Sequence, residues 1–544
     1  MRIHSIGYDQ IMSNPLFHSF IHSFASVNAF YEHDPRDAGA WIRMYDNVKA
    51  RNLSDSRRAV AQILTRQNKH FGSGETALIN AAALAESDTL VIATGQQVGL
   101  FTGPLYTVYK AITAVKLAER LQGVLGVKVV PVFWMASDDH DFAEINQVTV
   151  CPSDENPITL TLRPVDPEDR RSASDRRFGP EIAAVLDAYQ TALGTAPVAL
   201  DVINLLTSAC PPDRSLSDGF ARLMARLFKD RGLVIVDPTD PALKPLVQPI
   251  FERELLNPTV STQAVRHAAD QLTVAGYHPQ LDRQSDTVNL FRYEDGQRSA
   301  LTYREGRFHS RNEQTVLDSD AALDLVRSNP TLFSHNVITR PIVQDTLFPA
   351  LAYVGGPAEI GYYAQLREVY QQYDLPFPVV YPRASLTLIE PRIARLLEKH
   401  DLAVSDFASG AMETFHQRLR DEMPESLVTS FHRIRADVAR QLAELGEQVV
   451  PVDPTLQRLT EAALRKMEYE LDRIEDKTLQ ALKRSHRLMR DQIVRAETQL
   501  YPNRQPQERV ANIWGYIAVY GFGFMDTLFE AIDVSDFSHR EVWL

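Results

Sequence analysis

Cysteine is nearly absent from this chain: Cys151 and Cys210 are the only two among 544 residues. They lie far apart in the sequence, whereas a disulfide framework or a zinc knuckle needs several closely spaced cysteines. Both kinds of site are therefore excluded. So few cysteines favour a reducing compartment, and we expect a cytoplasmic protein.

A surplus of basic charge and long apolar runs are also lacking. Lysine and arginine number 57 against 70 aspartates and glutamates, which gives a formal net charge of -13. No basic block interleaved with aromatic residues occurs, so the electrostatic footprint of a nucleic-acid-binding protein is missing. No apolar run approaches the roughly 18 residues needed to cross a bilayer, and the first residues lack the apolar core of a signal peptide. We expect neither a nucleic-acid partner nor a membrane.

Three familiar catalytic signatures are missing. The sequence contains no Gly-x-Ser-x-Gly elbow, no phosphate loop ending in Lys-Ser/Thr and no Gly-x-Gly-x-x-Gly dinucleotide spacing. Covalent serine chemistry is therefore disfavoured. What the chain does have is size, because 544 residues with 44% hydrophobic composition can fill two or three cores.

The most informative pattern lies between residues 89 and 141. An apolar run (89–94) precedes a glycine-rich turn (95–104), an amphipathic stretch follows (105–121), and a second apolar run (127–136) ends in polar residues (137–141). This order predicts strand, turn, helix and strand in an open parallel sheet. Ligands of such sheets bind outside the carboxyl ends of the strands, so we expect both polar clusters to face one crevice.

The glycine-rich turn opens a predicted helix, whose free amides and dipole favour an anionic group. Gly95 and Gly99 are therefore candidate nucleotide-binding residues. The candidate substrate-binding residues of this segment are Gln96, Gln97, Thr102, Gly103 and Tyr106. Thr102 could instead cap the helix, which would give it a purely structural role.

Lys110 and the acidic cluster supply the candidate catalytic groups. Lys110 shares a helix face with Tyr106 and could approach a phosphate or carboxylate, although a solvent-facing lysine is the simpler alternative. His140 could act as a general base that accepts a proton. Asp138, Asp139 and Asp141 could bind an ammonium group or Mg²⁺, but adjacent residues point in different directions and cannot all ligate one ion. One aspartate could simply cap a helix.

Two later segments and one strand end complete the predicted site. A Gly-Gly turn before a helix start offers a second anion-friendly terminus. The candidate substrate-binding residues there are Arg340, Gln344, Asp345, Gly355, Gly356, Glu359 and Arg383. Arg340 and Arg383 are the best bidentate clamps for a carboxylate or phosphate, although either could be an ordinary buried ion-pair partner.

The C-terminal third changes to a helical period. Apolar residues recur every three or four positions from Phe431 to Val449 and from Leu464 to Leu500, the spacing of a coiled coil with a stutter. Prolines at 451 and 454 lie between the two stripes and predict the tip of an antiparallel helical hairpin. Apolar stripes left in water are unfavourable, so a homodimer is our hypothesis. A hairpin that buries its own stripes is the alternative.

These changes of pattern divide the chain into segments. The predicted segments are a sheet core over 1–150, 216–250 and 332–390, a first insertion over 151–215, a second insertion with β character over 251–331, a coiled-coil arm over 391–501 and a helical segment packing on the core over 502–544.

Several motifs give the chain a specific resemblance to a known family, and the match extends to residues 507–510. The motifs include Gly95-Gln96-Gln97-Val98-Gly99-Leu100-Phe101-Thr102-Gly103-Pro104, Ser137-Asp138-Asp139-His140-Asp141, Val354-Gly355-Gly356-Pro357-Ala358-Glu359 and Tyr381-Pro382-Arg383-Ala384-Ser385. With these motifs the chain resembles the BshC family, the cysteine ligases of bacillithiol biosynthesis.

The resemblance implies an α/β fold: a Rossmann-like core related to class I nucleotidyl-transferring synthetases, two inserted subdomains, a coiled-coil arm and a homodimer. It also implies a ligase that joins the carboxylate of L-cysteine to the amine of glucosaminyl-malate. ATP is the expected co-substrate through an activated carboxylate. Two rival interpretations stay open, namely a metal-dependent hydrolase or transferase using Asp138–Asp141, and a non-catalytic nucleotide-binding dimer.

Overall fold

The computed structural model describes the chain except residues 13, 52–53, 153–155, 164–168, 311–314 and 422. The described residues form two compact units. The first unit comprises residues 1–152, 157–388 and 505–544, and the second is formed mainly by residues 389–504.

A parallel sheet lies at the centre of the first unit. Its strands are β2 (Leu90–Gln96), β3 (Val129–Met135), β6 (Val234–Val236), β12 (Ala350–Gly355) and β13 (Val379–Pro382). Their spatial order is β13-β12-β2-β3-β6, and every neighbouring pair is parallel. The chain therefore adds β3 and β6 on one side of β2 and then β12 and β13 on its other side. The strand order reverses between β2 and β12, so the topological switch point lies at the carboxyl ends of these two strands. The predicted parallel-sheet core is confirmed.

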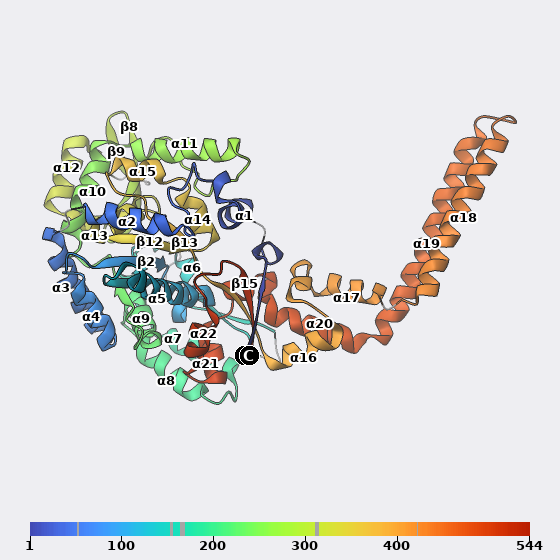
Figure 1. The fold of residues 1–544 in the computed structure, drawn as a ribbon, viewed down its shortest axis with the longest axis horizontal. Helices are drawn as coiled ribbons and strands as arrows, with labels where there is room; N and C mark the ends of the chain where they lie inside the picture. Colours follow the sequence, from blue (N-terminus) through green and yellow to red (C-terminus); the bar gives the residue numbers. More distant parts are fainter. Residues whose placement is uncertain (13, 52–53, 153–155, 164–168, 311–314, 422) are drawn as a thin grey trace. The chain divides into compact units, whose positions relative to one another are not determined.

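Both faces of this sheet are covered, because side chains of a strand point alternately to opposite faces. Ile92 belongs to one hydrophobic core, whereas its neighbours Val91 and Ala93 belong to the other. Figure 1 shows helices on both sides of the sheet. The first core includes α5 (Leu105–Leu125) and α9 (Leu216–Leu227), and the second includes α3 (Ser54–Phe71) and α10 (Lys244–Leu256).

Two long crossovers interrupt the sheet. The one between β3 and β6 contains β4 (Gln147–Val150), β5 (Ile158–Thr161), α7 (Ile182–Leu193) and α8 (Ala199–Ala209). The one between β6 and β12 carries α11 (Val260–Val274), α12 (Ser319–Ser328), α13 (Thr339–Leu347) and the antiparallel sheet β7 (Thr287–Glu294), β8 (Gln297–Arg304), β9 (Arg307–Ser310), β10 (Val316–Asp318) and β11 (Phe333–His335). The β character expected for residues 251–331 is found in this sheet.

The two ends of the chain pair with each other. β1 (Arg2–Ile6) runs antiparallel to β15 (His539–Trp543), and β15 also borders β14 (Ser385–Ile389). The predicted helical segment over 502–544 contains α21 (Ile513–Tyr520) and α22 (Phe524–Ala531), which pack on the first core, but it also contains the strand β15, which was not predicted. A strand whose partner lies at the other end of the chain leaves no local signal.

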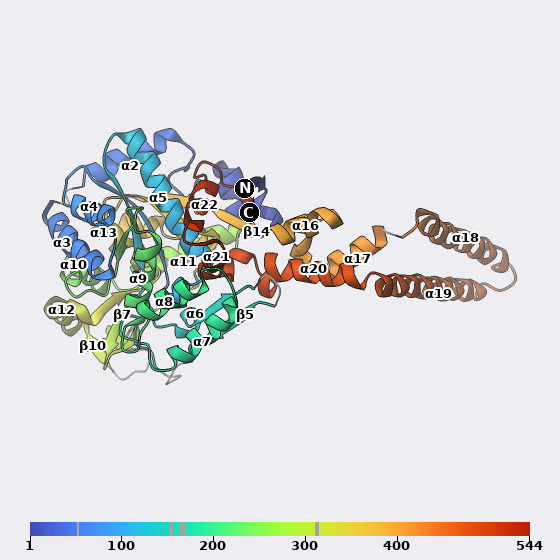
Figure 2. The same ribbon diagram turned by 90° about the horizontal axis from the view of Figure 1, so that it is seen from below.

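The second unit is helical. Its helices are α16 (Pro391–His400), α17 (Ala411–Asp421), α18 (Glu425–Val449), α19 (Leu456–Ser485) and α20 (Arg487–Leu500). Figures 1 and 2 show α18 and α19 side by side, and Arg435 of α18 pairs with Asp472 of α19 at 2.7 Å. The predicted antiparallel hairpin is confirmed. The second apolar stripe is shared between two helices, because α19 ends just before His486 and α20 begins after it.

No helix in the described part of the chain combines the length and the apolar character needed to span a bilayer.

Candidate functional site

A cavity of about 680 Å³ lies in the first unit where the carboxyl ends of β2 and β12 meet. Its walls also include residues of β3, the antiparallel sheet, α13, α14 (Pro357–Tyr363) and the short helix η7 (Gln507–Arg509). The structure brings these sequence candidates to the lining: Gly95, Gln96, Gln97, Tyr106, Lys110, Asp138, Asp139, Arg340, Gly356, Glu359 and Arg383. Three clusters far apart in the sequence thus share one cavity.

Other candidates do not reach the lining, namely Gly99, Thr102, Gly103, His140, Asp141, Gln344, Asp345 and Gly355. Gln344 and Asp345 lie behind it as supports. The Gln344 Oε1 accepts a hydrogen bond from Arg340 (3.1 Å), and the Asp345 carboxylate accepts one from the Tyr370 hydroxyl (2.7 Å). Thr102 is fully buried and donates to the Phe101 carbonyl (2.5 Å), so it neither caps α5 nor faces the cavity.

The glycine-rich turn is held by the C-terminal segment rather than left open for an anion. Phe101 and Gly103 both have positive φ, at 49° and 67°, a conformation that glycine adopts without strain. The Asn512 Nδ2 donates to the Phe101 carbonyl (2.8 Å) and the Gly103 carbonyl (2.6 Å). The Leu105 amide, the first of α5, donates to the Ala511 carbonyl (2.9 Å). The expected anion site at this helix start is therefore wrong for that amide, which the protein itself uses.

Lys110 is buried, so the solvent-facing alternative is wrong. Its side chain is 3% exposed, forms an ion pair with Glu359, and donates to the Gly95 carbonyl (3.0 Å) and the Gln96 Oε1 (2.7 Å). Because Lys110 follows β2 and Glu359 follows β12, this pair bridges the switch point. Burial lowers the pKa of Lys110 although Glu359 opposes the change, and nearby Arg383 and Arg340 lower it further.

Glu359 is fixed on every side. Burial alone would raise its pKa, but the Lys110 charge and the donated hydrogen bonds outweigh burial and lower it. The Tyr353 hydroxyl donates to Oε1 (2.5 Å) and the Gly356 amide donates to Oε2 (2.9 Å). The amide at the start of α14 is therefore satisfied by Glu359 itself, and Gly356 contributes shape rather than a free donor.

The two predicted clamps, Arg383 and Arg340, differ in their partners. Arg383 donates to both carboxylate oxygens of Glu508, at 2.9 and 2.6 Å, and both side chains are buried. Arg340 is 8% exposed, and no carboxylate of the described residues lies within 4 Å of its guanidinium. It donates to the Tyr362 hydroxyl (2.8 Å) and lies over the Tyr353 ring at 4.7 Å. The ion-pair alternative thus holds for Arg383 and fails for Arg340.

Asp138 is neutralised inside the protein. It accepts a hydrogen bond from the Tyr293 hydroxyl (3.0 Å) and lies 3.4 Å from Lys244 Nζ and 3.2 Å from His335 Nε2. Burial would raise its pKa, but the surrounding positive charges lower it to about 2. Burial, together with the charges of Lys244 and Arg298, lowers the pKa of His335 to about 3 although Asp138 opposes this. At neutral pH the pair therefore combines a carboxylate with a neutral imidazole.

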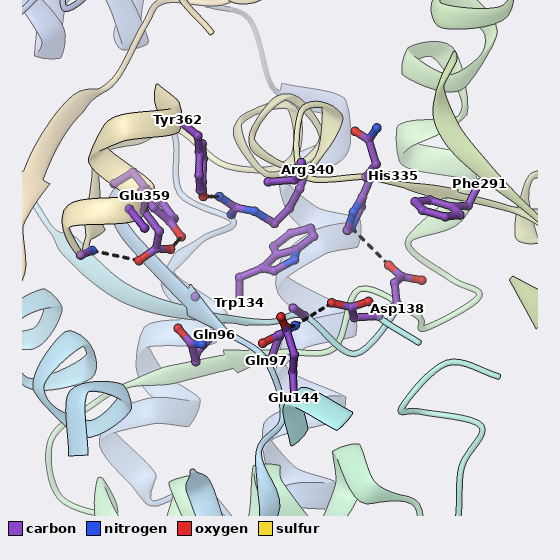
Figure 3. Close-up of a pocket in the computed structure, with 18 of the residues that line it drawn as sticks. Gln96, Gln97, Trp134, Asp138, Glu144, Phe291, His335, Arg340, Glu359 and Tyr362 are labelled. Carbon is purple, nitrogen blue, oxygen red and sulfur yellow. Dashed lines mark hydrogen bonds and ion pairs between the residues drawn. The ribbon is translucent and has the colours of Figure 1, made fainter. Parts of the chain in front are cut away.

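The other acidic groups follow the carboxyl end of β3. Gln97 donates to both Asp139 (2.8 Å) and Glu144, and Asp139 lies 3.6 Å from Arg298. Asp141 is exposed. The His140 ring packs against Phe291 at 5.7 Å, and its pKa is lowered by burial and by Arg298. Figure 3 shows Asp138, His335 and Phe291 on one side of the view and Glu359 and Tyr362 on the other, with Arg340 between them.

Asp138, Asp139 and Asp141 do not converge on one point. Among the residues that the structure describes, no group of three or more His, Cys, Asp or Glu side chains is arranged to hold a metal ion. Asp138 points toward Lys244 and Asp139 toward Gln97, as expected for neighbours that leave the chain in different directions.

Sequence reasoning missed several lining residues. They are Trp134, Glu144, Arg283, Phe291, Arg298, His335, Asn336, Tyr353, Tyr362 and Arg509, with Lys244 and Tyr293 behind them. Many belong to the antiparallel sheet and its loops, which have no glycine or charge pattern of their own. Asn336 and His335 directly precede the Thr339-Arg340 segment, a local signal that could have extended that cluster.

Fold and cavity together define a class: a doubly wound, Rossmann-like α/β protein with a charged small-molecule pocket at its switch point. Comparison with known families gives the particular one. Residues 1–384 match the model described as "Bacillithiol biosynthesis BshC, N-terminal Rossmann-like domain", and residues 386–543 match "Bacillithiol biosynthesis BshC, C-terminal coiled-coil domain". The chain belongs to the BshC family.

Curated relatives match over almost their whole length. A protein of Desulforamulus reducens is 31% identical over 100% of both chains. Proteins of Salinibacter ruber and Symbiobacterium thermophilum are 34% and 33% identical over 97% of this chain and 96% and 97% of theirs. Each is named "Putative cysteine ligase BshC". A solved Campylobacter jejuni chain titled as an arginyl tRNA synthetase aligns with a TM-score of 0.21 at 9% identity, covering 89% of this chain and 99% of that one, too distant to support an argument.

His335 should make the stability of the first unit depend on pH. The unfolded chain protonates this histidine near pH 6.5, whereas the folded protein keeps it neutral down to about pH 3. Folding stability is therefore lost as the pH falls through this window, by about 1.4 kcal/mol per pH unit for one group. We predict that between pH 7 and 5 the wild type loses about 2 kcal/mol more than His335→Gln.

Urea unfolding followed by tryptophan fluorescence measures this difference, because all four tryptophans (41, 134, 514 and 543) lie in the first unit. His432→Gln, at an exposed position of α18, is the control and should keep the wild-type slope. Equal pH slopes for wild type and His335→Gln would show that the neutral buried imidazole is not maintained.

Proposed function

We propose that this protein is a ligase that joins the carboxylate of L-cysteine to the amine of glucosaminyl-malate in the last step of bacillithiol biosynthesis. The observation that carries the proposal is one cavity with buried cationic groups, such as Lys110 and Arg340, and carboxylates such as Asp139 and Glu144. Such a cavity is complementary to substrates that carry both carboxylates and amines. The shared name of the relatives supports the same reaction class.

ATP is the proposed co-substrate, because an unactivated carboxylate resists attack by an amine and ATP supplies a leaving group. Its phosphates need cationic donors, and the cavity offers Lys110 and several arginines. The Leu105 amide already donates a hydrogen bond to the Ala511 carbonyl, so we propose that side chains bind the phosphates rather than the amides of the glycine-rich turn. Mg²⁺ could accompany ATP through its phosphate oxygens.

The carboxylates divide the remaining roles. Asp138 is already neutralised by Lys244, so Asp139 and Glu144 are the groups proposed to hold the cysteine ammonium. His140 is the proposed proton acceptor for the attacking amine. Its lowered pKa keeps it neutral, and its ring lies beside Phe291 and Arg298, two residues of the cavity wall. Lys110 is proposed to hold a developing negative charge in a preorganised position.

A homodimer through the coiled-coil arm is proposed as well. The hairpin buries its own stripes only in part, because Met467 and Ile474 of α19 are 48% and 56% exposed. We predict that the protein sediments as a dimer and that Met467→Glu combined with Ile474→Glu shifts it toward the monomer, because buried charges disfavour the interface. Sedimentation velocity measures this, with Val274→Glu, an exposed position outside the arm, as the control. A wild-type monomer would contradict the proposal.

Reconstitution tests the activity directly. Purified protein incubated with ATP, L-cysteine and glucosaminyl-malate should release a product with the mass of bacillithiol, together with AMP or ADP in equal amount. Mass spectrometry identifies the product, and the released nucleotide identifies the mode of activation.

His140→Ala, with its fold checked by circular dichroism, should reduce product formation about 100-fold if His140 accepts the proton.

The rival interpretations predict other results in the same assay. A metal-dependent hydrolase or transferase would be inhibited by chelators and indifferent to ATP. A nucleotide-binding dimer without catalysis would bind ATP and form no product. Near-wild-type turnover of His140→Ala would remove that residue from the mechanism without affecting the reaction class.

Variants of the Lys110–Glu359 pair test whether Lys110 has a structural or a catalytic role. Lys110→Met leaves Glu359 as a buried unpaired charge and should cost about 3 kcal/mol of stability or more. Adding Glu359→Gln should restore most of that stability, because a neutral pair fits the same space. Turnover should stay about 100-fold below wild type in both variants, because the cation is missing. Urea unfolding and the product assay check both statements. Recovery of turnover in the double variant would make the role of Lys110 structural.

A further inference from the structure

The charged groups around Lys110 are unequally compensated. Glu359 lines this end of the cavity, Glu508 lies behind its wall, and each is engaged by a cation. Glu359 pairs with Lys110, and Glu508 pairs with both terminal nitrogens of Arg383. Among the described residues, no other Lys or Arg nitrogen lies within 4 Å of either carboxylate.

Arg340 lines the cavity but pairs with neither carboxylate. Its side chain is buried, with 8% exposed. Its guanidinium donates hydrogen bonds to two neutral acceptors, the Gln344 amide oxygen (3.1 Å) and the Tyr362 hydroxyl (2.8 Å). The Tyr353 ring, 4.7 Å away, covers one face of the guanidinium. These contacts fix the plane of the fork without neutralising it. Figure 3 shows the guanidinium between Tyr362 and the His335 side of the cavity.

Arg509 and Arg283 line the same cavity from other parts of the chain. The Nε of each is buried and finds no hydrogen-bond acceptor among the described residues, and neither guanidinium has a carboxylate of those residues within 4 Å. Among the described residues, the Arg509 guanidinium donates one hydrogen bond, to the uncharged Met12 sulfur (3.4 Å). Its neighbour in η7, Glu508, is the residue that neutralises Arg383, so one turn supplies both a carboxylate behind the wall and a guanidinium in the wall.

Arg340 is buried, whereas Arg283 and Arg509 are half-buried. Cations withdrawn from water without a counter-charge are costly, and proteins usually pair them. We propose that Arg340, Arg509 and Arg283 form a subsite for a ligand with two or more negative charges, and that Arg383 serves as its rigid, internally paired wall. Planar guanidinium forks suit the oxygen pairs of carboxylates and phosphates. The subsite deepens the proposed function and rests on it for the identity of the anion, which is either a dicarboxylate such as the malyl group or a polyphosphate.

Isothermal titration of the full-length protein tests the subsite without requiring turnover. L-malate and inorganic tripolyphosphate are the two probes, titrated separately. Arg340→Gln, Arg509→Gln and Arg283→Gln should each weaken binding of the recognised probe about tenfold or more, because each removes a charge-assisted contact. Arg253→Gln is the matched control, since Arg253 pairs with Asp374 at an exposed position outside the cavity, and it should stay within about twofold of wild type.

Each outcome has a defined meaning. Loss of malate binding alone identifies a dicarboxylate subsite, loss of tripolyphosphate binding alone identifies a phosphate subsite, and mutual competition shows that both sources share it. The subsite is overturned if the wild type binds neither probe, or if all three variants bind as the wild type does. Arg340→Lys guards against misfolding of the glutamine variant, because it keeps the charge but loses the fork and should bind with intermediate affinity.

The product assay keeps this result separate from the proposed function. Arginine-dependent binding without any product would support the subsite and contradict the ligase. Product formation with an unchanged KM for both glucosaminyl-malate and ATP in all three variants would support the ligase and contradict the subsite.

Discussion

The buried ion pair between Lys110 and Glu359 is the interaction on which the cavity depends. It joins the helix after β2 to the helix after β12, the two strands that border the switch point. A parallel sheet leaves that gap open because its crossover helices diverge to opposite faces. The pair spans the gap with a charged contact, and Gly95, Gln96, Tyr353 and Gly356 complete the hydrogen bonds that two buried charges need. The rest of the cavity wall is arranged around this bridge.

The wall itself is assembled from segments that share no local order. The second crossover contributes His335 and Arg340, and the C-terminal segment contributes Arg509, with Glu508 behind the wall as the partner of Arg383. Glu508 also accepts a hydrogen bond from Ser385, whose hydroxyl contacts His539 of β15 at 2.7 Å. The pairing of the chain ends is thus connected through buried polar contacts to Arg383 in the cavity. A change in the terminal strands can reach the site by this route, because buried polar networks tolerate few unpaired groups.

Much of the architecture could be predicted from the sequence, but the roles of individual charged residues could be predicted only in part. The strand, turn, helix and strand pattern around Gly95 placed the sheet and its functional edge, and the proline-flanked stripes placed the hairpin of the arm. For Lys110, Arg340 and Arg383 the sequence allowed two interpretations each. The structure decided them differently, since Lys110 and Arg383 are paired and Arg340 is not. The turn that contains Gly99 and Gly103 suggested an anion site, but in the structure Asn512 donates hydrogen bonds to two of its carbonyls. Arg283 carried no pattern that singled it out, whereas Arg509 lay within the matched residues 507–510 and His335 directly preceded the Thr339-Arg340 segment, although neither signal placed them in the site.

The sequence by itself determined the periodic features: the parallel strands, the helices that cover them, the coiled-coil spacing and the collection of polar residues after β2, β3 and β12. These follow from local alternation of apolar and polar residues, which neighbouring positions encode. Only the tertiary structure decided which charges are compensated and which face the cavity. That outcome depends on distant partners such as Glu508, which lies 125 residues from Arg383, and Ala511, which pairs with Leu105. Electrostatic compensation is a property of distance in space rather than of position along the chain.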